Sequence, residues 1–316
     1  MLTIREFDYQ DWDYDHLAWF EDALFGGSIN VQDLRTRDQH RDSSLGFVRL
    51  VALDATSTMI GVIEATQRPA PWFSRGEVRL AVHQDFRRRG IGGALLGTLE
   101  TFLRERGGDA VMLYTSQTDE GLNQFLLHHG YSESFRGYQQ WLGLDRFDPN
   151  RFEVNWDRLN QAGVHLRSMA QLRDQWDTAQ KFYDLYTTLE RDAPRADEHF
   201  IAQSFEEFCT NNYDSPASFP EGVTFALKDD ELIGLNILYR DSNAPVVHNG
   251  LTGVRREYRG LGLALALKLE GIRCALVWGF EGITSYNAST NSAILRLNEK
   301  LGFQRSPATL EWRKKL

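Results

Sequence analysis

The 316-residue sequence contains one long internal repeat. The stretch HQDFRRRGIGGALL at residues 83–96 aligns with RREYRGLGLALALK at residues 255–268, and the two start 172 residues apart, at 83 and 255. The same separation relates the HHGY that ends at Tyr131 to the KLGF that ends at Phe303. Solenoid repeats span only about 20–45 residues, so this period is too long for a solenoid. The repeat therefore predicts a duplicated domain.

Strand and turn signals place the boundary between the two copies. GYQQWLGL at residues 137–144 is typical of a closing strand, and the polar, proline-containing stretch after it is typical of a connector. VHLRS at residues 164–168 then restarts the pattern that LTIRE begins at residues 2–6. We expect an N-terminal domain over residues 1–145, a connector over 146–163 and a C-terminal domain over 164–316.

Both copies show the same order of elements: a strand, helices, a hairpin, a long strand, a glycine-rich junction, then helix, strand, helix and strand. In the first copy FVRLVAL and IGVIEAT form the hairpin, and GEVRLAV is the long strand. In the second copy the hairpin turns at residues 228–231, and VVHNGLTGV is the long strand. Hairpins flanked by helices predict an α+β (mixed α/β) fold with a twisted, mostly antiparallel sheet in each domain.

Composition limits the compartment and the partners. With 35 Lys+Arg against 44 Asp+Glu the formal net charge is -9, which excludes a global nucleic-acid-binding surface. No apolar run approaches the roughly 18 residues of a membrane span, and the acidic start MLTIREFDYQDWDY is unlike a signal peptide. Cys209 and Cys274 form no CxxC pair. We expect a cytoplasmic protein without nucleic-acid, membrane or metal partners, whose two halves form an internal pseudo-dimer.

The glycine junction predicts an anion site in each copy. A strand that turns tightly into a helix leaves backbone N–H groups unpaired, with the positive end of the helix dipole behind them. Small residues at Gly90 and Gly92, and at Gly262 and Ala264, leave room for a pyrophosphate against those groups. The arginines at residues 87–89 add positive charge in the first copy.

Spacing separates this junction from other phosphate-binding loops. The G-x-x-x-x-G-K-[ST] pattern is absent, and G-x-G-x-x-G fails at its last place, where Leu95 and Leu265 stand. The remaining pattern, R-x-x-G-x-[GA] after a long strand, resembles the acyl-coenzyme A signature of GNAT acetyltransferases. The resemblance covers both halves of the chain. The tandem arrangement is similar to that of double-domain GNAT proteins of the mycothiol synthase type.

That resemblance implies an enzyme that moves an acetyl group from acetyl-coenzyme A, as cosubstrate, to a small-molecule primary amine by direct attack, with no metal. It places coenzyme contacts at Val82, Arg87, Arg88, Arg89, Gly90, Gly92, Val254, Arg259, Gly260, Gly262, Ala264, Asn287 and Asn291. Capping of the helix that begins near Ser292 is the alternative role for Asn291. An alkyl ammonium with a pKa of about 10 must lose a proton before attack, so a base is required.

Alternation along the long strands suggests the base. Counting back from Val254 in twos reaches Thr252, Gly250 and His248, a titratable group on the expected acceptor face. A structural histidine, hydrogen-bonded in the sheet, is the alternative for His248. The same count from Val82 gives only apolar residues, so we expect the second half to catalyse and the first half to bind without catalysing. A β-bulge in the strand would reverse this parity and present Glu77 and Arg79 instead.

The residue that usually acts as the general acid in the family is missing from both copies. Many GNAT enzymes place a tyrosine four residues before the glycine of the closing G-[YF], where this sequence has Leu126 and Asn298. Tyr286, at a strand end, is our candidate replacement. A packed, structural tyrosine is the alternative.

The resemblance implies that the acceptor is shaped by the segments between the first strand and the hairpin of each copy. These are residues 12–39 and 182–200, which carry acidic and aromatic groups. Glu190, Asp192, Asp197 and Glu198 are candidates to receive a cationic amine, and a solvated helix face is the alternative. Acetylation of a protein amine, a non-catalytic acyl-coenzyme A sensor and a nucleotide-phosphate binder remain open as other functions.

Overall fold

The computed structural model describes the chain except for residues 26–29, 43–45, 68–74, 176, 195–201 and 216–218. It forms two compact units, the first from Met1–Ser134 with Thr309–Leu316 and the second from Phe135–Ala308. Each unit therefore takes its last strand from the other copy of the repeat. β6 (Ser132–Gly143) pairs with β11 (Gly282–Ala288), and β13 (Thr309–Lys315) pairs with β5 (Ala110–Ser116). The boundaries of the compact units, after Ser134 and after Ala308, therefore differ from the boundary between the two copies of the repeat.

The first unit is a mixed sheet with the strand order β1-β2-β3-β4-β5-β13. Only its β4–β5 pair is parallel, among the pairings of the described residues. Its other elements are β1 (Thr3–Glu6), α1 (Asp11–Phe25), α2 (Val31–Gln39), β2 (Gly46–Leu53), β3 (Met59–Gln67), β4 (Arg75–Val82), η1 (Gln84–Phe86), α3 (Ile91–Glu105) and α4 (Glu120–His128).

The second unit repeats this arrangement with the strand order β6-β11-β10-β9-β8-β7, and β10–β11 is again parallel. Its other elements are η2 (Pro149–Arg151), α5 (Trp156–Gln161), β7 (Val164–Ser168), α6 (Met169–Leu172), α7 (Thr178–Asp192), α8 (Phe205–Phe208), η3 (Cys209–Tyr213), η4 (Pro220–Gly222), β8 (Thr224–Lys228), β9 (Glu231–Arg240), β10 (Val246–Val254), η5 (Arg256–Tyr258), α9 (Leu263–Val277), α10 (Ser292–Lys300) and β12 (Gln304–Arg305). The mixed α/β fold with a mostly antiparallel sheet is confirmed.

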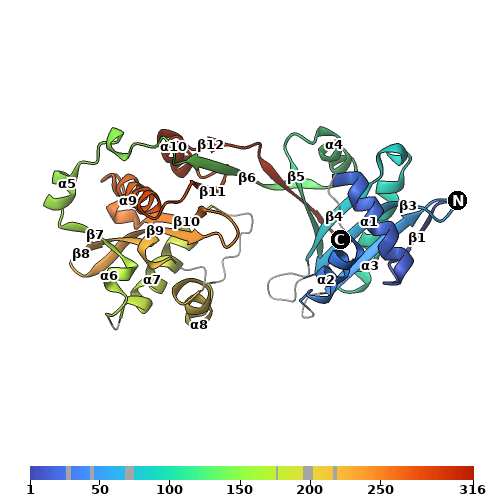
Figure 1. Cartoon of the computed structure of the whole chain (residues 1–316), viewed down its shortest axis with the longest axis horizontal. Helices are drawn as coiled ribbons and strands as arrows, with labels where there is room; N and C mark the ends of the chain where they lie inside the picture. Colours follow the sequence, from blue (N-terminus) through green and yellow to red (C-terminus); the bar gives the residue numbers. More distant parts are fainter. Residues whose placement is uncertain (26–29, 43–45, 68–74, 176, 195–201, 216–218) are drawn as a thin grey trace. The chain divides into compact units, whose positions relative to one another are not determined.

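Helices cover both faces of the second sheet (Figure 1). A Cβ atom on Gly234 of β9 would lie 3.1 Å from Leu267 of α9, and one on Gly253 of β10 would lie 3.0 Å from Leu189 of α7. The middle of β9 is consequently buried on both sides, which explains its nearly continuous apolar sequence. The site described below lies on the α7 face.

Local signals in the sequence correspond to observed turns. The β8–β9 hairpin turns at Asp229 and Asp230, which both have positive φ values (47° and 64°), as the type of tight turn expected here requires. α3 ends just before Gly107, which has a φ of 78°. Among the described residues, no helix combines the length and the apolar character that crossing a bilayer requires.

A buried ion-pair network fills the α1 face of the first sheet. The Arg49 guanidinium on β2 is fully buried and donates to Asp38 of α2 (2.8 Å) and to Glu64 of β3 (2.5 Å). These carboxylates raise the pKa of Arg49 against the opposing effect of its burial. Asp38 and Glu64 are themselves largely buried. Without Arg49 they would be left as uncompensated buried charges.

Replacing this cation should destabilise the first unit. We expect Arg49→Met to lower the free energy of unfolding by roughly 3–5 kcal/mol, because Asp38 and Glu64 would lose their compensating charge. Urea unfolding measures the loss. Arg146→Met, at a 93% exposed side chain, is the matched control and should change stability little. A loss below about 1 kcal/mol for Arg49→Met would contradict this interpretation of the network.

Candidate functional site

A β-bulge in β10 sets the orientation of the candidate base. His248 pairs with Tyr239 on β9, whereas Thr252 pairs with Asn236, so four steps on β10 match three on β9. The extra residue lies at 250–251 and reverses the side-chain alternation. Thr252 donates to Asn236 Oδ1 (2.7 Å), beside α9, while His248 shares the other face with Tyr239. The count that placed His248 and Thr252 on one face is therefore wrong, because the bulge lies between them.

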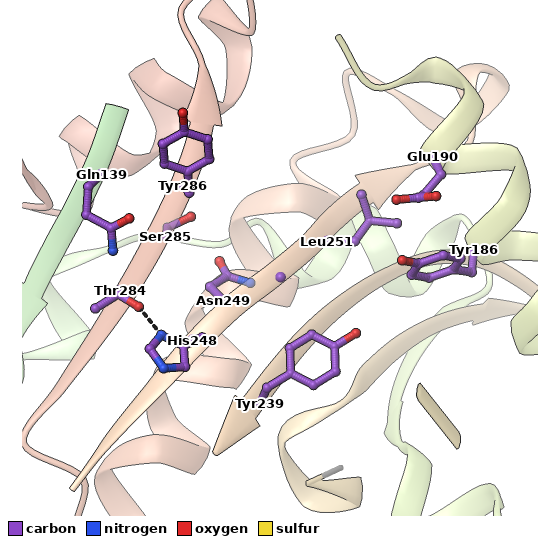
Figure 2. Close-up of a pocket in the computed structure, with 11 residues that line it drawn as sticks. Gln139, Tyr186, Glu190, Tyr239, His248, Asn249, Leu251, Thr284, Ser285 and Tyr286 are labelled. Atoms are coloured by element: carbon purple, nitrogen blue, oxygen red, sulfur yellow. Dashed lines mark hydrogen bonds between the residues drawn. The ribbon is translucent and has the colours of Figure 1, made fainter. Parts of the chain in front are cut away.

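His248 is held from two sides. It stands opposite Thr284 in the parallel β10–β11 pair, and its Nδ1 forms a hydrogen bond with Thr284 Oγ1 (Figure 2). Its Nε2 lies 2.8 Å from Asp241 Oδ2, in the turn after β9. The sheet register and the turn together fix the imidazole plane.

The two partners assign the protons of the ring. The backbone N–H of Asn243 and the hydrogen bond from His248 hold the pKa of Asp241 below its usual range. An ionised carboxylate only accepts hydrogen bonds, so Nε2 of His248 carries a proton. In neutral imidazole the lone pair is then on Nδ1, facing the Thr284 hydroxyl. The arrangement can take up a proton at Nδ1 through that hydroxyl.

His248 and Thr284 line a cavity of about 390 Å³ in the second unit. Strands β10 and β11 contribute one wall, which includes His248, Thr284 and Tyr286, and α7 contributes the opposite wall (Figure 2). The lining residues are Gln139, Tyr186, Glu190, Tyr239, His248, Asn249, Gly250, Leu251, Thr284, Ser285 and Tyr286. The sequence-predicted His248 and Tyr286 are thus brought to one cavity.

The cavity is acidic and aromatic on its α7 side. Tyr186 and Glu190 lie four residues apart on α7 and so share a helix face. Burial and the nearby Glu190 carboxylate raise the pKa of Tyr239 to about 12, and its hydroxyl donates to Asn212 Oδ1 (2.7 Å). Within the described part of the chain no Lys or Arg lines this cavity. Glu190 is the one carboxylate among the described lining residues.

The glycine junction has the same backbone geometry in both copies. Gly90 and Gly262 are the N-caps of α3 and α9, with φ values of 81° and 83° that favour glycine. Neither has a side-chain cap for the first turn, and a Cβ atom on either would contact nothing within 4 Å. Open space in front of uncapped helix N–H groups is suited to an anion.

The first arginine of each motif anchors the loop to the strand. Arg87 Nε donates to the carbonyl oxygen of Val82, and Arg259 Nε donates to that of Val254, both at 3.0 Å. The identical contact in both copies explains why an arginine stands at this place. Its main role in the described structure is to hold the turn in position.

Asp192 contacts this loop and does not line the cavity. Its carboxylate accepts hydrogen bonds from Arg256 (2.6 Å) and Arg259 (2.8 Å), and these arginines lower its pKa. Asp192 was a candidate to receive a cationic amine, and in the structure its carboxylate binds two arginines of the loop instead. Two other acidic candidates, Asp197 and Glu198, lie outside the described residues.

The remaining loop residues occupy equivalent places. Arg88 and Gly260 both have positive φ values (62° and 82°), and Gly92 and Ala264 are the second residues of α3 and α9. Arg89 is exposed beside the junction. A non-glycine residue at a positive φ, such as Arg88, is uncommon and indicates that the turn geometry is imposed by its surroundings.

Tyr286 lies in the cavity wall with 47% of its surface exposed. A Cβ atom on Gly137 of β6 would lie 2.4 Å from its hydroxyl, so only glycine there permits this ring position. The places of the usual acid, Leu126 and Asn298, are fully buried, and Asn298 donates to Gln140 Oε1 (2.8 Å).

The two asparagines after Tyr286 have local partners. Asn287 Nδ2 donates to Ser285 Oγ (3.0 Å) and to Gln140 Oε1 (3.2 Å). Asn291 is the N-cap of α10, and its side chain accepts from the backbone N–H of Ile294 (3.4 Å), which is the capping role that was the alternative.

A buried lysine stands behind the bulge. Lys268 of α9 is 3% exposed, and its Nζ donates to Asn249 Oδ1. Asn249 in turn donates to Asn236 Oδ1 (2.9 Å), which also receives the Thr252 hydroxyl (2.7 Å). Burial lowers the pKa of Lys268 to about 7. This network holds both ends of the bulge.

Sequence reasoning missed Asp241, Thr284 and Lys268. Asp241 stands in a turn, where aspartate is common for local reasons, so its sequence carries no signal for this role. Thr284 becomes visible only through the β10–β11 register. Lys268 did carry a signal, because it is a single cation in the apolar run LALALKLEGI.

The equivalent face of the first unit is occupied. β4 pairs with β3 without a register shift from Val82 to Gly76, so this stretch has no bulge. Arg79 nevertheless points to α1, where it donates to Glu21 (3.2 Å), and the Arg49 network adjoins it. The expectation of an apolar acceptor face in the first copy is wrong, because the apolar residues Val78 and Leu80 alternate with Arg79 and face α3. Among the described residues, no cluster of three metal-ligating side chains is present.

Comparison with known proteins agrees with the repeat. The model of the acetyltransferase (GNAT) family matches residues 7–131 and 179–303, and both ends of the match are displaced by 172 residues, from 7 to 179 and from 131 to 303. A mycothiol acetyltransferase from Paenarthrobacter aurescens (strain TC1) is 26% identical over 241 residues, which cover 73% of this chain and 67% of that protein.

Two solved structures share the fold over the whole chain. A GCN5-related N-acetyltransferase from Sphaerobacter thermophilus superposes with a TM-score of 0.69 at 16% identity, covering 99% of this chain and 95% of that one. A tandem GNAT protein from the clavulanic acid biosynthesis pathway superposes with a TM-score of 0.63 at 19% identity, covering 100% and 98%. The tandem architecture is therefore confirmed.

Lys268 should make stability depend on pH. Its pKa is lower in the folded state than its ordinary value of 10.5, so the unfolded chain binds a proton that the folded chain lacks between about pH 7 and 10.5. Stability then rises with pH across that window. We expect the stability gain of Lys268→Met over wild type to shrink by roughly 2–3 kcal/mol from about pH 6 to about pH 9.

Urea unfolding at the two pH values measures this difference. Lys300→Met, at an exposed residue of α10, is the control and should show a difference that does not change with pH. A pH-independent difference for Lys268→Met would show that Lys268 is not held in its low-pKa environment.

Proposed function

This chain belongs to the acetyltransferase (GNAT) family as two copies in tandem, and we propose that its second copy moves an acetyl group from acetyl-coenzyme A to a primary amine of a small molecule. The observation that carries the proposal is the acidic cavity in which His248 contacts both Thr284 and Asp241, beside the bulge of β10. One relative is named for mycothiol acetylation, and that name leaves the acceptor of this chain open.

The residues of the second junction fit coenzyme A. Gly262 leaves open space before the uncapped first turn of α9, which suits a diphosphate. We assign contacts to Val254, Arg259, Gly260, Gly262 and Ala264, with Arg259 fixing the turn through its bond to Val254. When bound, the coenzyme supplies a thioester, whose carbonyl carbon is the reacting centre. Asn287 and Asn291 are weaker candidates because both already have local partners.

The bulge supplies the polar backbone for that carbonyl. The register of β10 with β9 skips residues 250–251, and its register with β11 ends at Asn249. Gly250 and Leu251 nevertheless line the cavity. Backbone N–H groups at such a place stabilise the negative charge that develops on a carbonyl oxygen during acyl transfer.

His248 provides the base. Its Nδ1 takes a proton from the bound ammonium through the Thr284 hydroxyl, and Asp241 stabilises the imidazolium that results. The neutral amine attacks the carbonyl carbon, a C–N bond forms and the C–S bond breaks. After attack the nitrogen releases its second proton to solvent, and the departing thiolate takes up one proton. We propose Tyr286 as its donor, because it lies in the same wall as His248.

The first copy has a different proposed role. Its junction, with Val82, Arg87, Arg88, Arg89, Gly90 and Gly92, has the backbone geometry of the second and fits the same coenzyme. Its acceptor face holds the ion pairs of Arg49 and Arg79. We propose that domain 1–145 binds an acyl-coenzyme A without transferring the acyl group, and that domain 164–316 catalyses.

Blocking the second junction should remove one coenzyme site. We expect Gly262→Glu to reduce the acetyl-coenzyme A stoichiometry by one site in calorimetry, because a carboxylate would enter the space before α9. Gly262→Ala imposes a similar backbone strain without charge and should retain binding. Gly90→Glu tests the first junction separately. Full stoichiometry and affinity in Gly262→Glu would eliminate this junction as the coenzyme site.

Removing the base should slow turnover without weakening coenzyme binding. We expect His248→Gln to lower kcat by about 10²–10⁴-fold and to flatten the acidic limb of the pH–rate profile, since protonation of the base no longer limits the rate. Release of free thiol measures turnover, and calorimetry measures the affinity for acetyl-coenzyme A. An unchanged pH–rate profile would exclude His248 from the mechanism.

A further inference from the structure

Asp192 joins two parts of the second unit that the proposed reaction needs together. It is the last residue of α7, the helix that contributes one wall of the cavity (Figure 2). Its carboxylate accepts two hydrogen bonds from Arg256 (2.9 and 2.6 Å) and one from Arg259 (2.8 Å). Both arginines belong to residues 254–262, the coenzyme loop, which leads from β10 into α9. One side chain therefore links the cavity wall to the loop to which we assign the diphosphate.

The link continues into the strand through Arg259. Its Nε donates to the carbonyl oxygen of Val254 (3.0 Å), while its Nη2 donates to Asp192 (2.8 Å). A planar guanidinium that is held at two of its nitrogens has little freedom to turn. The end of β10, the coenzyme loop and the end of α7 are thus fixed to one another through a single group.

The place of Asp192 in its helix is electrostatically unfavourable. A carboxylate at the C-terminal end of a helix meets the negative end of the helix dipole. The side chain is also only 17% exposed, and the hydrogen bonds from Arg256 and Arg259 lower its pKa. A solvated helix face does not account for an acid in this place, because its charge is stabilised mainly by the two arginines.

The first copy lacks this link. Gln84 begins η1 at the place where Arg256 begins η5, 172 residues later in the chain, from 84 to 256. Arg87 keeps the bond to the Val82 carbonyl, and no carboxylate among the described residues pairs with it. Holding the shape of the loop therefore does not require the acid. In the described part of the chain, the link to the cavity helix is found in the copy to which we assign catalysis.

We propose that Asp192 is a positioning residue that couples the coenzyme loop to α7, so that coenzyme binding at the second junction fixes the cavity wall that α7 forms. This inference rests on the proposed function, because it requires coenzyme A at the first turn of α9. Asp192 contacts neither the thioester nor the amine. It acts through Arg256 and Arg259.

The kinetic test breaks the link from either side with opposite changes of charge. Asp192→Asn makes the coenzyme loop more positive, and Arg256→Gln, which introduces the residue found in the first copy, makes it less positive. We expect both variants to lower kcat about 5–50-fold, because the cavity wall is no longer held in position relative to the thioester. The acceptor is the amine that wild-type protein acetylates fastest in a panel of aliphatic amines and amino sugars.

Coenzyme affinity distinguishes positioning from a pure effect of charge. By calorimetry, Asp192→Asn should bind acetyl-coenzyme A more tightly and Arg256→Gln more weakly, each by less than about 10-fold. A role through charge alone would move turnover in opposite directions as well. Asp184→Asn, at an exposed acid of α7, makes the same change of charge without breaking the link and should keep the wild-type kcat.

Hydrogen exchange tests the link without turnover. Saturating coenzyme A should slow amide exchange in the last two turns of α7 about threefold or more in wild-type protein and in Asp184→Asn. In Asp192→Asn and Arg256→Gln this protection should be lost, while exchange at the first turn of α9 is still slowed. An ion pair that only stabilises the fold would change exchange in α7 by the same factor with and without the coenzyme.

The results separate this proposal from the proposed function. Protection of α7 that depends on Asp192, without turnover of any amine, would support the link and contradict acetyl transfer. Turnover with an unchanged kcat in both variants, or protection of α7 that persists in both, would overturn the role of Asp192 and leave acetyl transfer standing. If coenzyme A does not bind at the second junction, both are wrong.

Discussion

The extra residue that β10 carries against β9 determines how this site is built. Without it, strand alternation would place His248 on the same face as Thr252, against α9 and away from the cavity. The bulge is held from behind by Lys268 through Asn249, and Asn236 receives both Asn249 and Thr252. Burying the Lys268 ammonium is costly, and burial lowers its pKa, so the hydrogen bond to Asn249 that holds the bulge is formed at a cost in stability.

The two copies share the junction and differ at the acceptor face. Gly90 and Gly262 have nearly the same backbone conformation, and Arg87 and Arg259 make the same bond to the strand end. In the first copy β4 runs without a bulge, and Arg79 joins Glu21 beside the Arg49 network. The two copies therefore share the junction to which we assign the diphosphate. On the face to which we assign the amine, the first copy has ion pairs and the second has the cavity lined by His248.

The sequence was sufficient for the parts that depend on local geometry. The repeat, the hairpin at residues 228–231 and the glycine junction are each specified by residues close together in the chain. The alternation count along β10 placed His248 on the wrong face because the strand has one extra residue at 250–251. The only sequence signal for that bulge is a glycine. The pairing of β6 with β11 and of β13 with β5 joins strands far apart in the sequence. The contact of His248 with Thr284 and the effect of Glu190 on the pKa of Tyr239 also depend on such distant residues.

A crystal structure of the protein soaked with acetyl-coenzyme A tests the central claim most directly. We expect density for the diphosphate at the first turn of α9 and for the thioester carbonyl at the bulge formed by Gly250 and Leu251, with the acetyl group facing His248. Density for the coenzyme at the first turn of α3 alone, or a thioester that lies outside the cavity of the second unit, would contradict it.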